Sequence, residues 1–241
     1  MLIVKIIKSV EKIFFPNVCP ICGEVIGPKD KICGRCVDKV KIIEEPKCQK
    51  CGKQLCTDEK LLCQDCNDID HVFDRGICVF EYTEEFRHSL YKFKYDNKRC
   101  YSDLFGYVAA KKYKKTLRKW KVEKILPVPM YSKKQQRRGY NQAETFGQAL
   151  AEYTGIGMDA KCLARVRDTK PQKGLNKEER HQNLQNAFGV DKERLQGIKS
   201  VLLVDDIYTT GSTVDGCARV LKSAGLEKVY CMCVAGGKDK N

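Results

Sequence analysis

The spacing of apolar residues changes near residue 70 and divides the chain into two parts. Beyond residue 70, short apolar runs alternate with segments in which apolar residues recur every three to four positions, as in Phe86, Leu90 and Phe93. The pattern predicts strands over 74–83, 124–130, 199–206 and 228–236, and helices over 84–95, 104–113, 140–154 and 214–225. Alternating strands and helices indicate an α/β fold with a parallel sheet flanked by helices.

The most apolar of these strands is 199–206, which reads KSVLLVDD. Its continuous apolar run is typical of a parallel strand that is buried on both faces. The turn TTGST, a helix closed by Gly225 and the strand over 228–236 follow, so that the segment predicts a βαβ unit. Because ligands of such sheets bind at the carboxyl ends of the strands, the residues after Val204 are candidates for a binding site.

The first seventy residues contain few large apolar side chains and instead carry a repeated cysteine pattern. CPICG and CGRC form one half of the repeat, and CQKCG and CQDC form the other. A CxxC turn directs two thiolates at one point, so two such turns complete a tetrahedral zinc site. Gly23 and Gly52 supply the left-handed backbone that zinc knuckles favour. The eight expected ligands are Cys19, Cys22, Cys33, Cys36, Cys48, Cys51, Cys63 and Cys66.

These ligands predict two structural zinc ions and leave the pairing open. The halves can form two consecutive ribbons, or the first CxxC can pair with the third. Cys56 is a ninth cysteine in this region and is interpreted as a bystander. Since four cysteines leave no open coordination position, zinc is expected to stabilise the fold rather than to catalyse, with a dithiol redox role as the minor alternative. The expected domains are a zinc module over 1–70 and an α/β domain over 71–241.

The N-terminal segment MLIVKIIKSVEKIFFP has neither the pattern of a signal peptide nor that of a membrane span. Lys5, Lys8 and Lys12 interrupt its apolar residues. The spacing predicts an amphipathic helix packed on the protein, with binding to a membrane surface or a partner as the alternative. Because the segment lacks the pattern of an export signal, a cytoplasmic location is expected, with the cytoplasmic face of the inner membrane as one option. In that reducing compartment the fifteen cysteines are more typical of metal ligands than of disulfides.

The formal net charge of +14 favours polyanionic partners. Two basic stretches also contain aromatic residues, a combination that is typical of proteins that bind single-stranded nucleic acid. These stretches are KKYKKTLRKWK, with Tyr113 and Trp120, and YSKKQQRRGY. A solvated helix face explains the first stretch equally well, so both interpretations stay open.

The segment VLLVDDIYTTGST combines two kinds of recognition at the end of a strand. Asp205 and Asp206 can accept hydrogen bonds from the hydroxyl groups of a ribose. The following TTGST adds hydroxyls, backbone N–H groups and Gly211 at a helix N-terminus, where a phosphate dianion binds readily. Recognition of a diol followed directly by recognition of a phosphate describes a ribose 5-phosphate.

This segment resembles the motif that binds phosphoribosyl pyrophosphate (PRPP) in type I phosphoribosyltransferases, and the whole chain resembles the ComF family of competence-associated proteins. The resemblance covers nearly the full length. The segments that carry it are CPICG, FKY, LPVPM followed by RRGYNQAE, and RVRDTKPQKGLNKEERHQNLQNAF. It implies a type I phosphoribosyltransferase fold behind a double zinc ribbon.

The resemblance also implies roles for individual residues. The two aspartates would hold the ribose hydroxyls, directly or through Mg²⁺, and the TTGST turn would hold the 5-phosphate. The implied PRPP-binding set is Asp205, Asp206, Thr209, Thr210, Gly211, Ser212 and Thr213. A pyrophosphate loop would lie at 127–129, and a flexible loop over 165–180 would close on the ligand. Further candidates around these loops are Lys94, Arg137, Arg138, Asn141, Gln142, Arg167 and Arg180.

For function, the ComF resemblance implies PRPP binding and the handling or transport of single-stranded DNA in natural transformation, with proteins of the competence machinery as partners. The alternative is an active phosphoribosyltransferase that transfers ribose 5-phosphate from PRPP to an unidentified acceptor. Such catalysis needs positioning and charge stabilisation rather than a visible nucleophile. No segment of the sequence identifies an acceptor pocket, so catalysis is left open.

Overall fold

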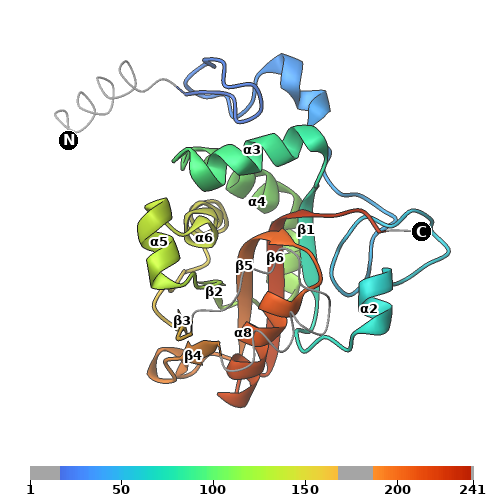
Figure 1. Ribbon diagram of the computed structural model, residues 1–241. Coiled ribbons are helices and arrows are strands. Elements are labelled where there is room, and N and C mark those ends of the chain that lie inside the picture. The colour runs from blue at the N-terminus through green and yellow to red at the C-terminus, as the bar shows by residue number, and fades with distance from the viewer. Residues whose placement is uncertain (1–16, 168–186, 240–241) are drawn as a thin grey trace.

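The computed structural model describes residues 17–167 and 187–239 (Figure 1). The expected N-terminal helix and most of the expected closing loop, including Arg180, lie outside the described residues. Among the helices that are described, none is both long enough and apolar enough to cross a membrane.

The centre of the structure is a parallel sheet of four strands. These strands are β1 (Gly76–Glu81), β2 (Lys124–Pro127), β5 (Ser200–Tyr208) and β6 (Lys228–Gly236). They lie in the order β1-β6-β5-β2, and each neighbouring pair is parallel. A second, antiparallel pair consists of β3 (Leu163–Arg165) and β4 (Phe188–Val190). The predicted parallel α/β sheet is therefore confirmed.

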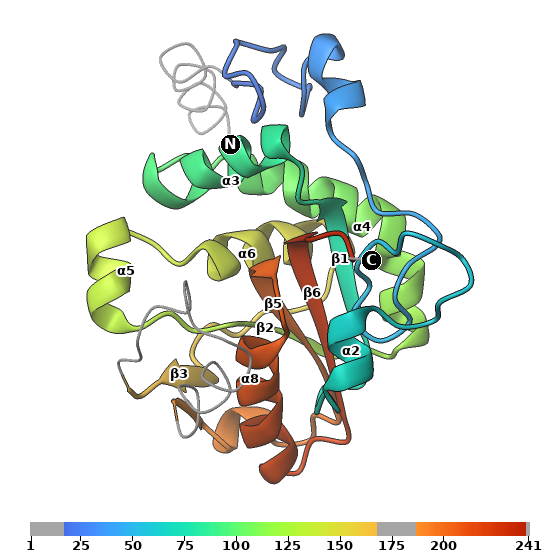
Figure 2. The same cartoon turned by 45° about the vertical axis from the view of Figure 1, so that its right-hand side comes forward.

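Helices cover both faces of the sheet (Figures 1 and 2). On one face lie α3 (Glu84–Tyr95), α4 (Tyr101–Lys119) and α6 (Gln142–Thr154), and on the other lies α8 (Ser212–Ser223). Alternate residues of β5 enter the two cores, because successive side chains of a strand point to opposite faces. The buried run of β5 thus serves both cores, as its sequence predicts.

The helix ends follow from local sequence. Helix α3 begins after Thr83, whose Oγ1 accepts a hydrogen bond from the N–H of Phe86 at 3.3 Å. Helix α4 runs past the predicted end at residue 113, because Leu117 continues its buried stripe through the basic stretch. Among the short helices that were not predicted is α5 (Ser132–Arg138), which has no buried residue and ends at the left-handed Gly139. The remaining short elements are η1 (Gly34–Lys39), α2 (Gln64–Asp68) and η2 (Glu193–Leu195).

The two halves of the cysteine module fold alike. In each half the N–H of the first cysteine donates to a carbonyl five residues on, at 2.7 Å for Cys19 and 2.8 Å for Cys48. Gly23 and Gly52 have φ angles of +83° and +79°, in the left-handed region that the sequence predicts. The second CxxC of each half opens a short helix, with its first cysteine at the N-cap position, and this helix is η1 in the first half and α2 in the second.

Each half of the module joins a different core of the α/β domain. Cys19 and Cys36 of the first half share the core of α3 and α4, whereas the four ligand cysteines of the second half share the core of α8. Figure 1 shows the first half above α3 and the second half, with α2, beside β1. The connection between them pairs antiparallel with the free edge of β1, at Ile42 and Phe80.

The second half contacts the sheet backbone directly. The N–H of Gly76, the first residue of β1, donates to the carbonyl of Lys50 at 2.6 Å. A Cβ atom at Gly52 would lie 2.8 Å from the Cα of Ile77, so only glycine permits this approach. The second zinc half is thus packed onto the edge strand of the sheet.

Candidate functional site

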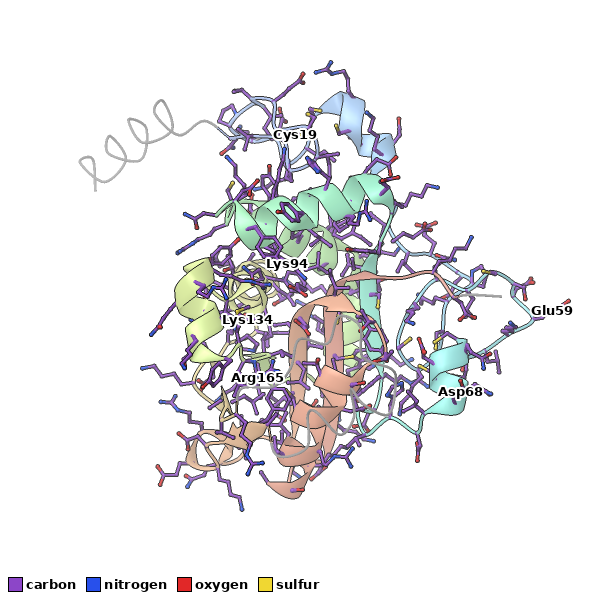
Figure 3. The ribbon with its side chains drawn as sticks, viewed as in Figure 1. Cys19, Glu59, Asp68, Lys94, Lys134 and Arg165 are labelled. Carbon is purple, nitrogen blue, oxygen red and sulfur yellow. The ribbon has the colours of Figure 1, made fainter. Side chains whose placement is uncertain are left out.

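Two carboxylates and a lysine meet at the carboxyl end of β5. Asp205 and Asp206 end the apolar run of this strand, and Lys94 reaches them from the last turn of α3 (Figure 3). The Nζ of Lys94 lies 2.9 Å from Oδ2 of Asp206, and both side chains are mostly buried. The N–H of Asp206 donates to Oδ1 of Asp205 at 2.8 Å. The sequence singled out all three residues, and the structure brings them together.

The charges of this group depend on one another. Burial and the adjacent charge of Asp206 raise the pKa of Asp205 to about 7. Burial alone would lower the pKa of Lys94, but the attraction of Asp206 and Asp205 outweighs burial and raises it. A cation or a set of hydroxyl donors at this strand end would favour the ionised form of Asp205.

The TTGST turn follows β5 and opens α8. Gly211 is the residue before the helix and has a φ angle of +80°. A Cβ atom there would lie 2.4 Å from Oη of Tyr208 and 2.8 Å from Cε1 of His71. The hydroxyls of Thr210 and Ser212 lie 2.9 Å apart and are buried. The turn therefore places hydroxyls and a glycine backbone at a helix N-terminus, as a phosphate site requires.

A buried network of polar side chains contacts the TTGST turn and the first turn of α8. The sequence analysis did not predict this network. Nδ1 of His71 lies 2.6 Å from Oδ2 of Asp215, in the first turn of α8, and Oδ1 of Asp215 accepts from the N–H of Val72 at 2.9 Å. On its other side Nε2 of His71 lies 3.3 Å from Oη of Tyr208. His71 directly follows the zinc module, so the network connects the module to the turn. A single histidine in a connecting segment gives no indication in the sequence that it will join a buried hydrogen-bond network.

The candidates from RRGYNQ divide into two groups. Arg138 donates to Oε1 of Gln142 at 3.1 Å, and Nε2 of Gln142 donates to the carbonyl of Lys94 at 3.4 Å. This chain of contacts brings α5 and α6 to the acid pair. Asn141, in contrast, is buried and caps α6, accepting from Ala143 and donating to the carbonyl of Val128. Arg137 is exposed on α5.

The last part of the described site comes from β3. Arg165 ends this strand, and its positive charge opposes the rise in the pKa of Asp205 that burial and Asp206 cause (Figure 3). Its guanidinium carbon lies 5.6 Å from the ring centre of Phe188. The sequence placed Arg165 only at the start of the closing loop and gave it no role. Arg167 is exposed at the edge of the described residues.

Of the four aromatic residues in the basic stretches, three are buried or packed on another ring, and the fourth, Tyr131, is partly exposed. Tyr113 is only 6% exposed, and Tyr140 is buried as well. Trp120 stacks on Tyr230, with ring centres 4.3 Å apart and planes inclined by 11°. The basic side of α4 is therefore a solvated helix face with its aromatic residues turned toward the core, the simpler of the two interpretations of that stretch.

The cysteines form two four-ligand clusters, and the consecutive pairing is the one observed. Within each cluster the candidate ligand atoms lie within 4.8 Å of one another, and the clusters are Cys19, Cys22, Cys33 and Cys36, and Cys48, Cys51, Cys63 and Cys66. A tetrahedral zinc ion with Zn–S bonds of about 2.3 Å requires sulfur atoms about 3.8 Å apart. The Sγ atoms of Cys22 and Cys33 are 3.7 Å apart, and those of Cys51 and Cys63 are 3.6 Å apart. Both clusters fit zinc.

The thiols of the second cluster cannot all ionise without a cation. Hydrogen bonds from Cys51, Cys63 and Cys66 lower the pKa of Cys48, while the neighbouring Cys48 raises the pKa of Cys66. A zinc ion removes this conflict because it stabilises all four thiolates. Cys56 belongs to neither cluster, and its thiol donates to the carbonyl of Asp239 at 3.3 Å.

Comparison with known proteins agrees with this architecture. A double zinc ribbon domain model matches residues 10–67, and a phosphoribosyl transferase domain model matches residues 141–241. Competence protein F of Haemophilus influenzae is 32% identical over 90% of this chain and 95% of its own length. Competence protein ComFC of Streptococcus pneumoniae is 25% identical over 82% of this chain and 84% of its own length.

A shorter match comes from the DNA utilization protein YhgH of Salmonella typhimurium, which is 39% identical over 46% of this chain and 49% of its own length. The match to Competence protein F, in contrast, extends over 222 residues. A double zinc ribbon joined to a type I phosphoribosyltransferase domain, in the same order along a chain of similar length, assigns this protein to the ComF family.

Proposed function

We propose that this protein binds PRPP together with Mg²⁺ at the carboxyl end of β5, and that it handles single-stranded DNA during natural transformation. The observation that carries the proposal is the adjacency of the acid pair to the TTGST turn. Asp205 and Asp206 suit a ribose diol or its Mg²⁺ ion, and the turn at Gly211 suits the 5-phosphate. One ligand with both groups is a phosphoribosyl compound.

Cations surround the place where the pyrophosphate would lie. Lys94 stands beside Asp206, Arg165 acts on Asp205, and Arg138 contacts Gln142 next to Lys94. Arginine can meet phosphate oxygens in pairs, which suits a pyrophosphate group. When bound, Mg²⁺ would be held through Asp205 and Asp206 and would neutralise part of the ligand's charge.

The DNA part of the proposal is supported by the relatives and by the charge. The matched relatives are named for competence and for DNA utilization. The chain has a formal net charge of +14, which favours an anionic polymer as a partner.

Two binding measurements on the zinc-loaded full chain test the two parts separately. Thermal shift with PRPP, ribose 5-phosphate and pyrophosphate, each with Mg²⁺, should give the largest stabilisation with PRPP, because only PRPP occupies both halves of the site. A labelled oligo(dT) should bind with an affinity that falls steeply as salt rises, and a duplex of the same length should bind more weakly. Equal shifts for all three compounds would argue against a PRPP site, and no strand binding would argue against DNA handling.

Release of pyrophosphate distinguishes binding from transfer. If the protein is an active transferase, PRPP and a suitable acceptor should yield pyrophosphate at a rate that depends on acceptor concentration. If PRPP is only a ligand, a panel of purine and pyrimidine bases should leave PRPP intact, while the thermal shift with PRPP persists.

A further inference from the structure

Three of the four exposed tyrosines of the described chain gather beside the acid pair. The four are Tyr82, Tyr91, Tyr95 and Tyr107. The first three are 38%, 56% and 56% exposed and line one groove of about 810 Å³. Lys94 and Ile207 line the same groove, so the groove adjoins Asp206. We name Tyr82, Tyr91 and Tyr95 the tyrosine shelf.

The shelf presents ring surface in an arrangement that suits stacking. Tyr91 and Tyr95 lie one turn apart on α3, with ring centres separated by 4.8 Å. Tyr82 lies just after the end of β1 and lines the same groove. Apolar ring surface gathered in one exposed place is typical of a binding site, whereas single exposed aromatic residues are ordinary.

Cations flank the shelf and make it complementary to a polyanion. The guanidinium of Arg138 lies 4.8 Å from the ring centre of Tyr95 and donates to Oη of Tyr95 at 3.1 Å. Helix α5, which ends at Arg138, also carries the exposed Lys133 and Arg137. Figures 1 and 2 both show α5 next to the end of α3.

The acidic groups of the groove are already paired. Glu84 accepts from Arg87 at 3.1 Å, and Asp206 pairs with Lys94 at 2.9 Å. These two pairs balance in charge, so the surplus of positive charge beside the rings comes from Lys133, Arg137 and Arg138 of α5. In the two basic stretches, in contrast, Tyr113 and Tyr140 are buried, Trp120 is packed on another ring, and Tyr131 is only partly exposed.

We propose that the tyrosine shelf is where bases of single-stranded DNA stack, while the cations of α5 contact the phosphates. This inference rests on the proposed function and locates its DNA-binding part. A strand is the expected occupant because its bases are free to stack, and base–aromatic stacking tolerates every sequence. A duplex keeps its bases stacked within the helix and can offer only its backbone.

The test compares strand affinity of ring-deleting and ring-preserving variants of the zinc-loaded full chain. Fluorescence anisotropy with labelled oligo(dT) should show that Tyr91→Ala and Tyr95→Ala each weaken binding about fivefold or more. Tyr91→Phe and Tyr95→Phe should stay within about twofold of the native affinity, because phenylalanine keeps the ring. Thermal melting of each variant checks that the exposed positions leave the fold intact.

An abasic strand provides a control that distinguishes base stacking from purely electrostatic binding. It keeps the phosphates and lacks the bases, so it should bind the native protein more weakly than oligo(dT) does. It should bind the Tyr91→Ala/Tyr95→Ala double variant and the native protein with the same affinity, since neither the rings nor the bases can then contribute a stacking contact.

The outcomes separate this inference from the function on which it rests. If the native protein binds no strand, the DNA part of the proposed function fails. If the native protein and the double variant bind oligo(dT) equally well, strand binding stands and the tyrosine shelf is overturned as its location. Loss of affinity in the phenylalanine variants equal to that in the alanine variants would also overturn it, because hydroxyl contacts rather than stacking would then be responsible.

Discussion

Replacement of Asp205 by asparagine should change how the stability of the folded protein depends on pH. Burial and the adjacent Asp206 raise the pKa of Asp205 from the ordinary 3.8 to about 7 in the folded state. The folded protein then binds a proton that the unfolded chain releases between these values. The stability that the protonated Asp205 contributes is fully present below pH 3.8 and is lost as pH rises toward 7. Asparagine has no such titration.

The size of the effect follows from the two pKa values. Between pH 6 and pH 8, Asp205 with a pKa near 7 goes from mostly protonated to mostly ionised, which lowers the free energy of unfolding by about 1.4 kcal/mol. The free energy of unfolding of the Asp205→Asn variant, relative to the native protein, should therefore rise by about that amount over this range. The measurement is urea unfolding of both zinc-loaded proteins at pH 6 and pH 8, followed by circular dichroism.

The comparison of two proteins removes effects that both share, such as the pH dependence of zinc binding. Asp206→Asn is the matched control, since loss of its charge should lower the pKa of Asp205 and move the effect to lower pH. If the difference between the native protein and Asp205→Asn is the same at both pH values, Asp205 does not titrate between pH 6 and pH 8, and the reasoning about the buried pair is wrong.

Three further predictions concern the turn and the zinc clusters. Gly211→Ala should weaken PRPP binding at least tenfold in calorimetry, because the added Cβ would collide with Tyr208 and His71. Gly197→Ala is the matched control: it has the same left-handed backbone strain but open space around the added Cβ, so it should leave PRPP binding unchanged. Gly52→Ala should lower the free energy of unfolding by about 2 kcal/mol or more in urea unfolding, since the sheet backbone cannot move aside; a loss like that of Gly197→Ala would contradict this. Zinc release to a chromogenic chelator should have a fast phase from the cluster with the exposed Cys22, and Cys22→Ser should remove that phase alone; a single phase would count against the difference in burial.

Sequence patterns predicted the α/β part of the fold well where local signals coincide with packing. The helix over 84–95 is observed with the same ends, because Thr83 caps it and acidic residues occupy its first turn. The strand over 228–236 is also observed as predicted. Helix α4 extends six residues beyond the predicted end at 113, because Leu117, within the basic stretch, continues the buried face of the helix. Lysines on a solvated face are compatible with helix or loop, and only packing decides between them.

The site was predictable to the extent that its residues are adjacent in sequence. Asp205, Asp206 and Gly211 belong to one motif, and the structure keeps them together. The support beneath them is not local, because His71 and Asp215 are distant in the chain and meet only through tertiary folding. The same holds for the tyrosine shelf, whose rings come from the end of β1 and from α3.

The position of the zinc module also depends on tertiary contacts. The spacing of the cysteines predicted both clusters but left consecutive and crossed pairing open, and the geometry of the clusters decides for the consecutive one. Spacing carries no information about which surface each ribbon covers. The close approach of Gly52 to β1 brings the cysteines of the second ribbon into the core shared by the sheet and α8. A left-handed glycine in a zinc knuckle does not by itself predict that contact.

The most direct test of the central claim is calorimetric titration of the zinc-loaded protein with PRPP and Mg²⁺. The native protein and an exposed-acid control, Asp58→Asn, should bind PRPP saturably and alike, because Asp58 lies on the zinc module away from the acid pair. The Asp205→Asn/Asp206→Asn double variant should lose this binding while keeping both zinc ions. Binding that persists in the double variant, or no binding to the native protein, would contradict the assignment of a phosphoribosyl site to the carboxyl end of β5.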